Sequence, residues 1–189
     1  MIRDVKMGKN VSIECPNSVI IKNCELGDNV YIGANVKIID VKIGRDTKIY
    51  SFVNLYGPNL IIGENCKIGC FVEIQKDVII GNKSIISSHS FICSGVTLEG
   101  NNFISHGCMF SNDRFPQAYN EKYYLEKTTI KYGAVIGSGS NLLPVTVGRF
   151  ATIGMGSIIV EDVPDYGLVY GKNSKALLVK IKPNKLTRD

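Results

Sequence analysis

The feature that most constrains the fold of this chain is an aliphatic or aromatic residue at every sixth position. The clearest run consists of Ile62, Ile68, Ile74, Ile80, Ile86, Ile92, Leu98, Ile104 and Phe110. Two positions before most of these stands a small or β-branched residue, and a glycine often follows directly. The pattern predicts short strands with two inward side chains each, separated by tight turns. A period of six is out of phase with the 3.6-residue helical turn, which excludes an amphipathic helix.

The repeat extends in both directions with small slips in register. Its other members are Met7, Ile13, Val19, Leu26, Ile32, Ile38, Ile43, Ile49 and Leu55 upstream, and Ile130, Ile136, Leu142, Val147, Ile153 and Ile159 downstream. Every slip follows a multiple of three repeats, so three repeats form one triangular coil and the irregularities gather at one corner. We therefore expect about eight coils over residues 1–160, a long loop insertion at 111–129, and a tail at 161–189. A short helix over 174–180 would cap the open end, which otherwise exposes unpaired backbone groups.

Composition limits the function classes. The chain has 189 residues, of which 44% are hydrophobic and 21% charged, and this excludes a disordered protein. A net charge of +5 without a basic run argues against nucleic acid and suits a small anionic ligand. The first ten residues have no apolar signal core and no apolar stretch is long enough to cross a membrane, so we expect a cytoplasmic protein.

Cysteine and histidine usage argues against a metal site. The six cysteines form no CxxC pair and are expected to be reduced packing groups. Only two histidines are present, His89 and His106, so a three-histidine metal site is excluded and we expect no metal.

The repeat resembles that of the hexapeptide-repeat acyltransferases over nearly the whole chain. This resemblance implies an all-β fold, a left-handed parallel β-helix, and assembly into a homotrimer. The apolar outward residues Phe71, Phe91 and Met109 also favour association, because a monomer rarely exposes so much apolar surface.

Three segments narrow the resemblance. They are Phe71–Gln75, Ser87–Cys93 and Ser105–Pro116, the last of which contains the motif Asn112-Asp113-x-x-Pro116. They resemble the enzymes that N-acetylate 3-amino sugars linked to dTDP or UDP, which implies acetyl-CoA as cosubstrate and a nucleotide-linked amino sugar as acceptor. Arginine often follows this motif in that branch, whereas this chain has Gln117, so we favour a neutral deoxysugar.

His89 and Glu73 are the candidate catalytic residues. With Ile92 and Ile74 inward, both point outward by strand parity, and Glu73 is the diagonal neighbour of His89. An imidazole is suited to accept the proton that an amine loses as it attacks a thioester. Because related enzymes have asparagine near this position, the alternative is that His89 only positions the amine. We expect the long loop to leave from the same face and to complete the site.

The remaining candidates line the substrate and cofactor sites. His106 is expected to form a pocket wall, while Asn112, Asp113 and Arg114 either cap the loop or contact the sugar or its pyrophosphate. Gly107, above His89, is expected to offer its backbone N–H to the thioester oxyanion. The expected acetyl-CoA contacts are the small outward positions Gly137, Ser138 and Ala151 and the cations Arg149, Lys172 and Lys175.

Two other functions fit the same residues. An O-acetyltransferase acting on a sugar or serine hydroxyl would need His89 as a base more strictly, because a hydroxyl must lose its proton as it attacks. A non-enzymatic β-helical scaffold would not need a long loop beside the two histidines.

Overall fold

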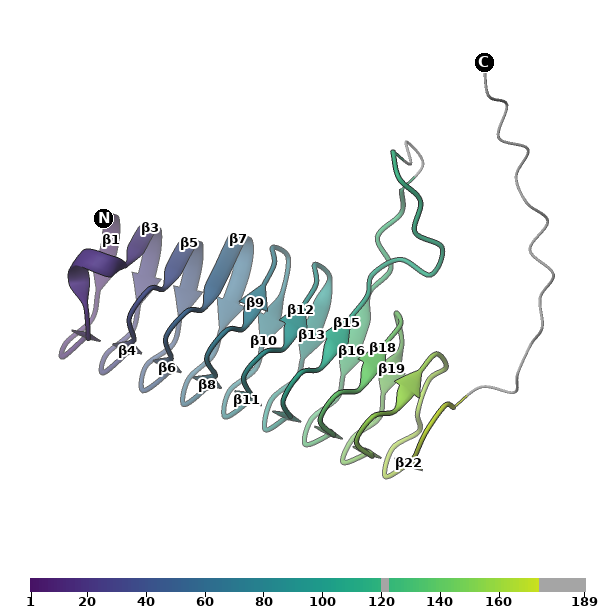
Figure 1. Ribbon diagram of the computed structural model, residues 1–189. Helices are drawn as coiled ribbons and strands as arrows, with labels where there is room; N and C mark the ends of the chain where they lie inside the picture. The colour runs from purple at the N-terminus through teal and green to yellow at the C-terminus, as the bar shows by residue number, and fades with distance from the viewer. Residues whose placement is uncertain (120–122, 174–189) are drawn as a thin grey trace, which may run out of the picture.

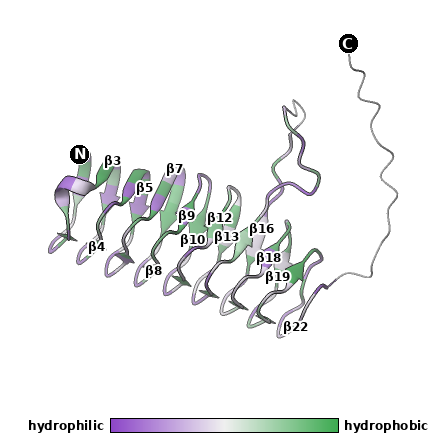
Figure 2. Cartoon of the chain, viewed as in Figure 1, coloured by the Kyte–Doolittle hydropathy of each residue, from purple (hydrophilic) through white to green (hydrophobic). Residues whose placement is uncertain are grey.

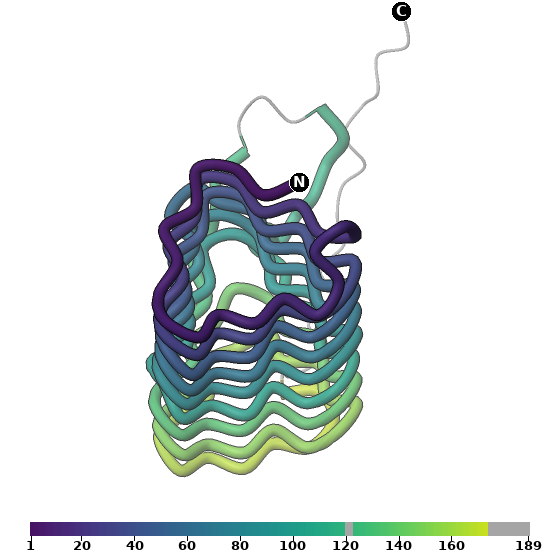
Figure 3. Tube along the Cα trace, turned by 90° about the vertical axis from the view of Figure 1, so that its left-hand side faces the viewer, coloured from purple at the N-terminus to yellow at the C-terminus, as the bar shows by residue number. Residues whose placement is uncertain are grey.

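The computed structural model describes residues 1–119 and 123–173 and shows a parallel β-solenoid (Figure 1). The single helical element in this part of the chain is a 3-10 turn, η1 (Pro16–Ser18), so no described helix has the length and apolarity needed to span a bilayer. Successive turns stack around a common axis (Figure 3). The expected all-β fold is confirmed, and the architecture is the one expected of a left-handed β-helix.

One sheet takes one strand from each of nine turns. Its strands, in order, are β2 (Ser12–Ile13), β4 (Tyr31–Ile32), β6 (Lys48–Ile49), β8 (Lys67–Ile68), β11 (Ile85–Ile86), β14 (Phe103–Ile104), β17 (Val135–Ile136), β20 (Thr152–Ile153) and β22 (Leu168–Val169). We call this the second face.

The other two faces belong to a 13-stranded sheet. Early in the chain four strands bend around the corner between these faces: β1 (Ile2–Met7), β3 (Ile20–Leu26), β5 (Lys37–Ile43) and β7 (Asn54–Ile62). Beyond them the third face has β9 (Glu73–Ile74), β12 (Phe91–Ile92), β15 (Met109–Phe110), β18 (Asn141–Leu142) and β21 (Ile158–Ile159). The first face has β10 (Ile79–Ile80), β13 (Val96–Leu98), β16 (Thr128–Ile130) and β19 (Thr146–Val147).

The aliphatic repeat fills the interior. Ile32, Ile68 and Ile104 of the second face are fully buried, as are Ile74 and Ile92 of the third. Their neighbours along each strand point outward, and Figure 2 shows hydrophobic and hydrophilic segments alternating along the coils. Because aliphatic side chains occupy the interior, any binding site must lie on an outer face or a corner.

Up to residue 173 the structure has nine turns, one more than the number of about eight that was expected. After β21 the tail forms a further turn, in which Val163 bridges Val147, β22 pairs with β20, and Lys172 bridges Ile158. The repeat did not reveal this turn because it supplies only two apolar positions, Val163 and Val169. The helix expected over 174–180 lies outside the described residues.

The long loop leaves the solenoid between β15 and β16 and projects away from it (Figure 1). It starts at the corner between the third and first faces, which we call the loop corner. Its described aromatic side chains are exposed: Phe115, Tyr119, Tyr123 and Tyr124.

Candidate functional site

His89 lies at the corner between the second and third faces, which we call the His89 corner. This corner requires a left-handed backbone in successive turns, and His89 has φ 63°. The residues below it in the same column are Phe71 and Phe52, with φ 60° and 63°. The three rings stack: centroids are 4.8 Å apart for Phe52 and Phe71, and 4.9 Å for Phe71 and His89. The imidazole is exposed and its plane lies within 7° of the Phe71 ring.

Glycines continue the column above His89. Gly107, Gly139 and Gly156 have φ between 67° and 69°, and a Cβ added to any of them would meet no atom within 4 Å. We call these three residues the glycine shelf. Adding a side chain would therefore occupy open space, so the surface directly above the imidazole is accessible to a ligand.

The oxyanion role expected for Gly107 is wrong for this geometry. Its backbone N–H donates to the carbonyl oxygen of Ser88 at 3.0 Å, one of the hydrogen bonds that joins successive turns. An amide already used in this way cannot also point at a thioester oxygen without breaking that bond.

Glu73 lies in register with Phe91, one diagonal step from His89. In residues 1–119 and 123–173 no hydrogen bond or ion pair joins the Glu73 carboxylate to the imidazole. The diagonal placement expected from strand parity is present, but the arrangement gives Glu73 no contact through which it orients His89.

A hollow of about 320 Å³ opens on the second face beside the His89 corner. His106 lines it, as expected for a pocket wall, together with Tyr50, Lys67, Ser87 and Ser88. The sequence reasoning missed Lys67. The signal in the sequence is that Lys48 and Lys67 each stand one position before an inward isoleucine of the repeat. Because β6 pairs with β8, these two lysines are adjacent cations on the second face.

The expected substrate residues on the loop fasten it to the solenoid instead. Arg114 donates from Nε to the Glu126 carboxylate at 3.1 Å, from Nη1 to the Val160 carbonyl at 3.0 Å, and from Nη2 to the Pro144 carbonyl. All three nitrogens of the guanidinium donate hydrogen bonds within the protein. Of the two roles expected for Arg114, the structure therefore supports capping of the loop and not a contact with the sugar or its pyrophosphate.

Asn112 and Asp113 also make local contacts. Asn112 donates to the carbonyl oxygen of Ser94, and the Asp113 carboxylate accepts the N–H of Phe115 at 2.7 Å. The loop leaves the far edge of the third face from His89, so these three residues and the imidazole do not form one cluster.

The expected cofactor residues are only partly brought together. Gly137 and Ser138 lie at the His89 corner, where Ser138 shares a 2.6 Å hydrogen bond with Ser105. Ala151 was expected to face outward, and this is wrong because its side chain is fully buried in the core. Arg149 lies at the corner between the first and second faces, away from the glycine shelf, whereas Lys172 bridges Ile158 of the third face. Lys175 lies outside the described residues.

Burial controls the thiol chemistry. Cys24, Cys66, Cys93 and Cys108 are buried, and loss of hydration raises the pKa of each thiol, for Cys93 to about 12. These groups are neutral packing residues and not nucleophiles, as expected from the sequence. Cys15 is exposed.

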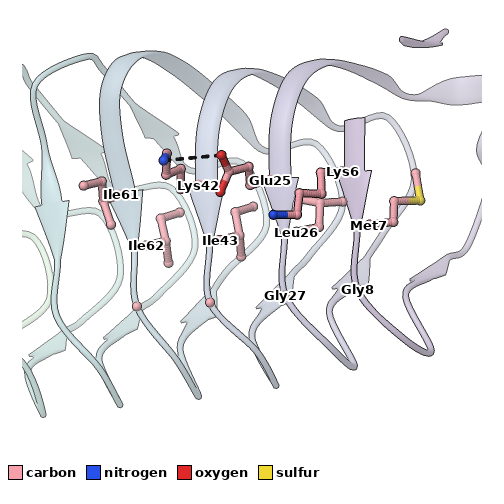
Figure 4. A pocket seen from close by; sticks show the side chains of 12 residues that line it. Lys6, Met7, Gly8, Glu25, Leu26, Gly27, Lys42, Ile43, Ile61 and Ile62 are labelled. Atoms are coloured by element: carbon pink, nitrogen blue, oxygen red, sulfur yellow. Dashed lines mark ion pairs between the residues drawn. The ribbon is translucent and has the colours of Figure 1, made fainter. Parts of the chain in front are cut away.

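A separate groove of about 440 Å³ lies on the first face in the early turns (Figure 4). Gly8, Gly27, Gly44 and Gly63 are among the residues that line it, and the Lys42 ammonium pairs with the Glu25 carboxylate at 3.4 Å. None of the candidate residues lines this groove, and its two paired charged groups, Lys42 and Glu25, are exposed to solvent and engaged with each other. The His89 corner therefore remains the candidate site.

Comparison with known proteins supports the repeat. The family model of the bacterial transferase hexapeptide (six repeats) matches residues 4–39 and 59–94. Over these residues the chain carries the six-residue repeat that this family model describes. This hexapeptide-repeat protein is 37% identical over 194 residues to the bifunctional protein GlmU of Heliobacterium modesticaldum, a match covering 99% of the chain and 34% of that protein. It is 36% identical to GlmU of Ruthia magnifica, covering 93% of the chain and 36% of the relative. The matched part therefore makes up only about a third of the length of each of these two curated relatives.

Solved structures share the fold of the hexapeptide-repeat protein. The UDP-N-acetylglucosamine acyltransferase from Campylobacter jejuni superposes with a TM-score of 0.72 at 16% identity, covering 91% of this chain and 70% of that one. The polySia-specific acetyltransferase NeuO gives a TM-score of 0.53 at 20% identity, covering 92% and 84%. At these identities the likeness concerns the fold alone.

Proposed function

We propose that this protein is an N-acetyltransferase that moves an acetyl group from acetyl-CoA to the amino group of a nucleotide-linked 3-amino-deoxysugar. The observation that carries the proposal is the His89 corner. There an exposed imidazole is held by a stacked ring and lies directly beneath an open shelf of glycines. An acyl transfer to an amine needs such a group, accessible at its edge and next to room for a thioester.

In the proposed reaction the sugar amine attacks the thioester carbonyl, an amide bond forms, and the carbon–sulfur bond breaks. His89 either takes the proton from the amine or holds the amine by a hydrogen bond while the departing thiolate takes it. The hollow on the second face, with His106 as a wall, is the proposed place for the nucleotide-linked sugar. Lys67 supplies a positive charge there for its phosphates.

The glycine shelf is the proposed path of the acyl donor. An extended chain fits a surface where Gly107, Gly139 and Gly156 have no side chains and where added ones would meet open space. Lys172, exposed on the last described turn, is suited to the donor's phosphates. Arg149 is not, because it lies at a different corner. We also propose a homotrimer, since Phe71 and Met109 are 52% and 45% exposed around the third face.

The comparisons agree with an acyl transfer but do not select the substrate. The matching family is named for transferases, and the structure with the higher TM-score of the two described acts on UDP-N-acetylglucosamine by its name. A nucleotide sugar and an acyl group are thus associated with this fold in a related protein. The amine, the ring position and the acetyl group belong to our proposal.

The test is release of free thiol from acetyl-CoA, followed with a disulfide reagent, across dTDP- and UDP-linked amino sugars. Matched sugars with a hydroxyl in place of the amine, and free serine, form the second arm. Because Cys15 is exposed and Cys70 is half-buried, a Cys15→Ser variant lowers the background reaction of the enzyme, and a reaction without acceptor measures what remains. We expect turnover with a 3-amino sugar only. Turnover with the hydroxyl arm alone would replace the proposal with O-acetyl transfer, and no turnover with any acceptor would favour a scaffold.

A further inference from the structure

We infer that Phe71 is a positioning residue that fixes the orientation of the His89 imidazole, and that Glu73 does not have this role. The inference rests on the proposed function in one respect, the part His89 has in acyl transfer. The geometric claim stands on the structure of the His89 corner alone.

The first observation is the backbone conformation of three ring-bearing residues. Asn35 precedes them in the column with φ 55°, and the glycine shelf follows with φ near 68°. The corner therefore requires a left-handed backbone, which glycine and asparagine adopt easily and bulky residues rarely adopt. Phe52, Phe71 and His89 nevertheless adopt it in three successive turns. The left-handed backbone also recurs at the other corners of the solenoid, so it brings the three rings into one column without by itself marking a site.

The second observation is the stacking of the rings. The Phe52 and Phe71 planes are 5° apart, and the Phe71 and His89 planes 7° apart. Two parallel contacts of this kind hold an aromatic side chain by its face. Phe71 is in the middle of the stack, in contact with both other rings, whereas Phe52 reaches His89 only through it.

The third observation is which polar groups surround the imidazole. Glu73 lies one diagonal step away and His106 in the next turn, yet no hydrogen bond to the His89 ring nitrogens occurs among the described residues. A carboxylate that orients a histidine does so by accepting its N–H. Here that bond is missing, and the aromatic face supplies the constraint instead.

The two faces and the edge of the imidazole ring therefore have different surroundings. Phe71 covers one face, and the other face is directed toward the open space at Gly107 in the next turn. Both ring nitrogens, at the edge, are left free to meet a substrate amine. Replacing the phenyl ring would free the imidazole to rotate away from that direction.

The experiment compares Phe71→Asn with Phe52→Asn as the matched control. Asparagine suits the left-handed backbone, as Asn35 does in the same column, so neither variant adds backbone strain. Phe71→Tyr restores a ring at the position, and Glu73→Gln removes the carboxylate charge. Thermal unfolding of each variant reports whether the fold is retained.

The first readout is the proton NMR signal of the His89 ring, which stacking shifts upfield. The chain has only two histidines, so His106→Asn assigns the signals. We expect Phe71→Asn to remove the upfield shift, and Phe71→Tyr, Phe52→Asn and Glu73→Gln to keep most of it. An unchanged His89 signal in Phe71→Asn, or its loss in Glu73→Gln, would overturn the inference.

The second readout is kinetic. Phe71→Asn is expected to lower kcat by about 10- to 100-fold with little change in KM for acetyl-CoA, and Phe71→Tyr to restore it. A loss of kcat equal in Phe52→Asn and Phe71→Asn would contradict a specific role of Phe71. If no acceptor supports turnover, the proposed function fails, while the NMR result still decides whether Phe71 orients the imidazole.

Discussion

The backbone N–H of Gly107 donates to the carbonyl oxygen of Ser88 at 3.0 Å, so the residue directly above His89 belongs to the ladder between turns. The open space above the imidazole is therefore bounded by an amide whose hydrogen bond is already made. A ligand on the glycine shelf meets backbone without side chains there, and the Gly107 N–H is not a free donor. Stabilisation of a developing oxyanion must come from another group.

The glycines of this chain should fall into two classes on substitution. A Cβ on Gly44 would lie 2.6 Å from the carbonyl carbon of Gly63, so Gly44→Ala forces two turns apart. We expect it to lower the free energy of unfolding by about 1–3 kcal/mol. Gly107→Asn adds its side chain to open space at φ 67° and should cost about 1 kcal/mol or less. Urea unfolding distinguishes them, and equal losses would mean that the shelf is not open.

The period of six was sufficient to predict the interior of this fold. Spacing identified buried positions such as Ile68 and Ile104 because each coil repeats the same inward geometry. Spacing also placed His89 outside and Gly107 above it. It could not show the stack on Phe71, because the repeat determines which way a residue faces and not the plane of its ring.

The contacts of the long loop could not be predicted from the sequence. Arg114 meets Pro144 and Val160, which are 30 and 46 residues away and belong to turns that follow the loop. No repeat covers residues 111–127, so neither the path of the loop nor these partners could be inferred. The error over Ala151 has a different origin: it lies two positions before Ile153, where the repeat itself places a second inward side chain, so the expected outward orientation departed from the pattern.

Arg114 should be necessary to hold the start of the loop against the solenoid. Arg114→Ala removes three hydrogen bonds, two of them to backbone carbonyls, and should lower the free energy of unfolding by about 1–3 kcal/mol. Limited proteolysis within 111–127 should become faster. The control is Arg45→Ala, which removes an exposed ion pair with Glu64 and should leave the urea midpoint unchanged. Equal protease resistance of wild type and Arg114→Ala would show that other contacts hold the loop.

Stability should fall in alkaline solution because of the buried thiols. The pKa of Cys93 is raised by burial from its ordinary value of 9 to about 12. Its contribution is fully present below pH 9 and is lost between pH 9 and 12, where the unfolded chain ionises first. The expected slope is about −1.4 kcal/mol per pH unit for this thiol. Urea unfolding of Cys93→Ala should show a shallower decline than wild type, and identical slopes would place this thiol in contact with water.

His89 is the residue on which the proposed chemistry depends, and two substitutions separate its possible roles. If it accepts the proton, His89→Ala should lower kcat by about 10²–10⁴-fold. The loss should diminish at high pH, where more of the sugar amine is already deprotonated. His89→Asn keeps a hydrogen-bonding group in a residue that tolerates the left-handed backbone, but it cannot accept a proton. Near-wild-type turnover in His89→Asn beside a defective His89→Ala would mean that the imidazole only positions the amine. Full activity of both variants at saturating substrate would place the reaction away from this corner.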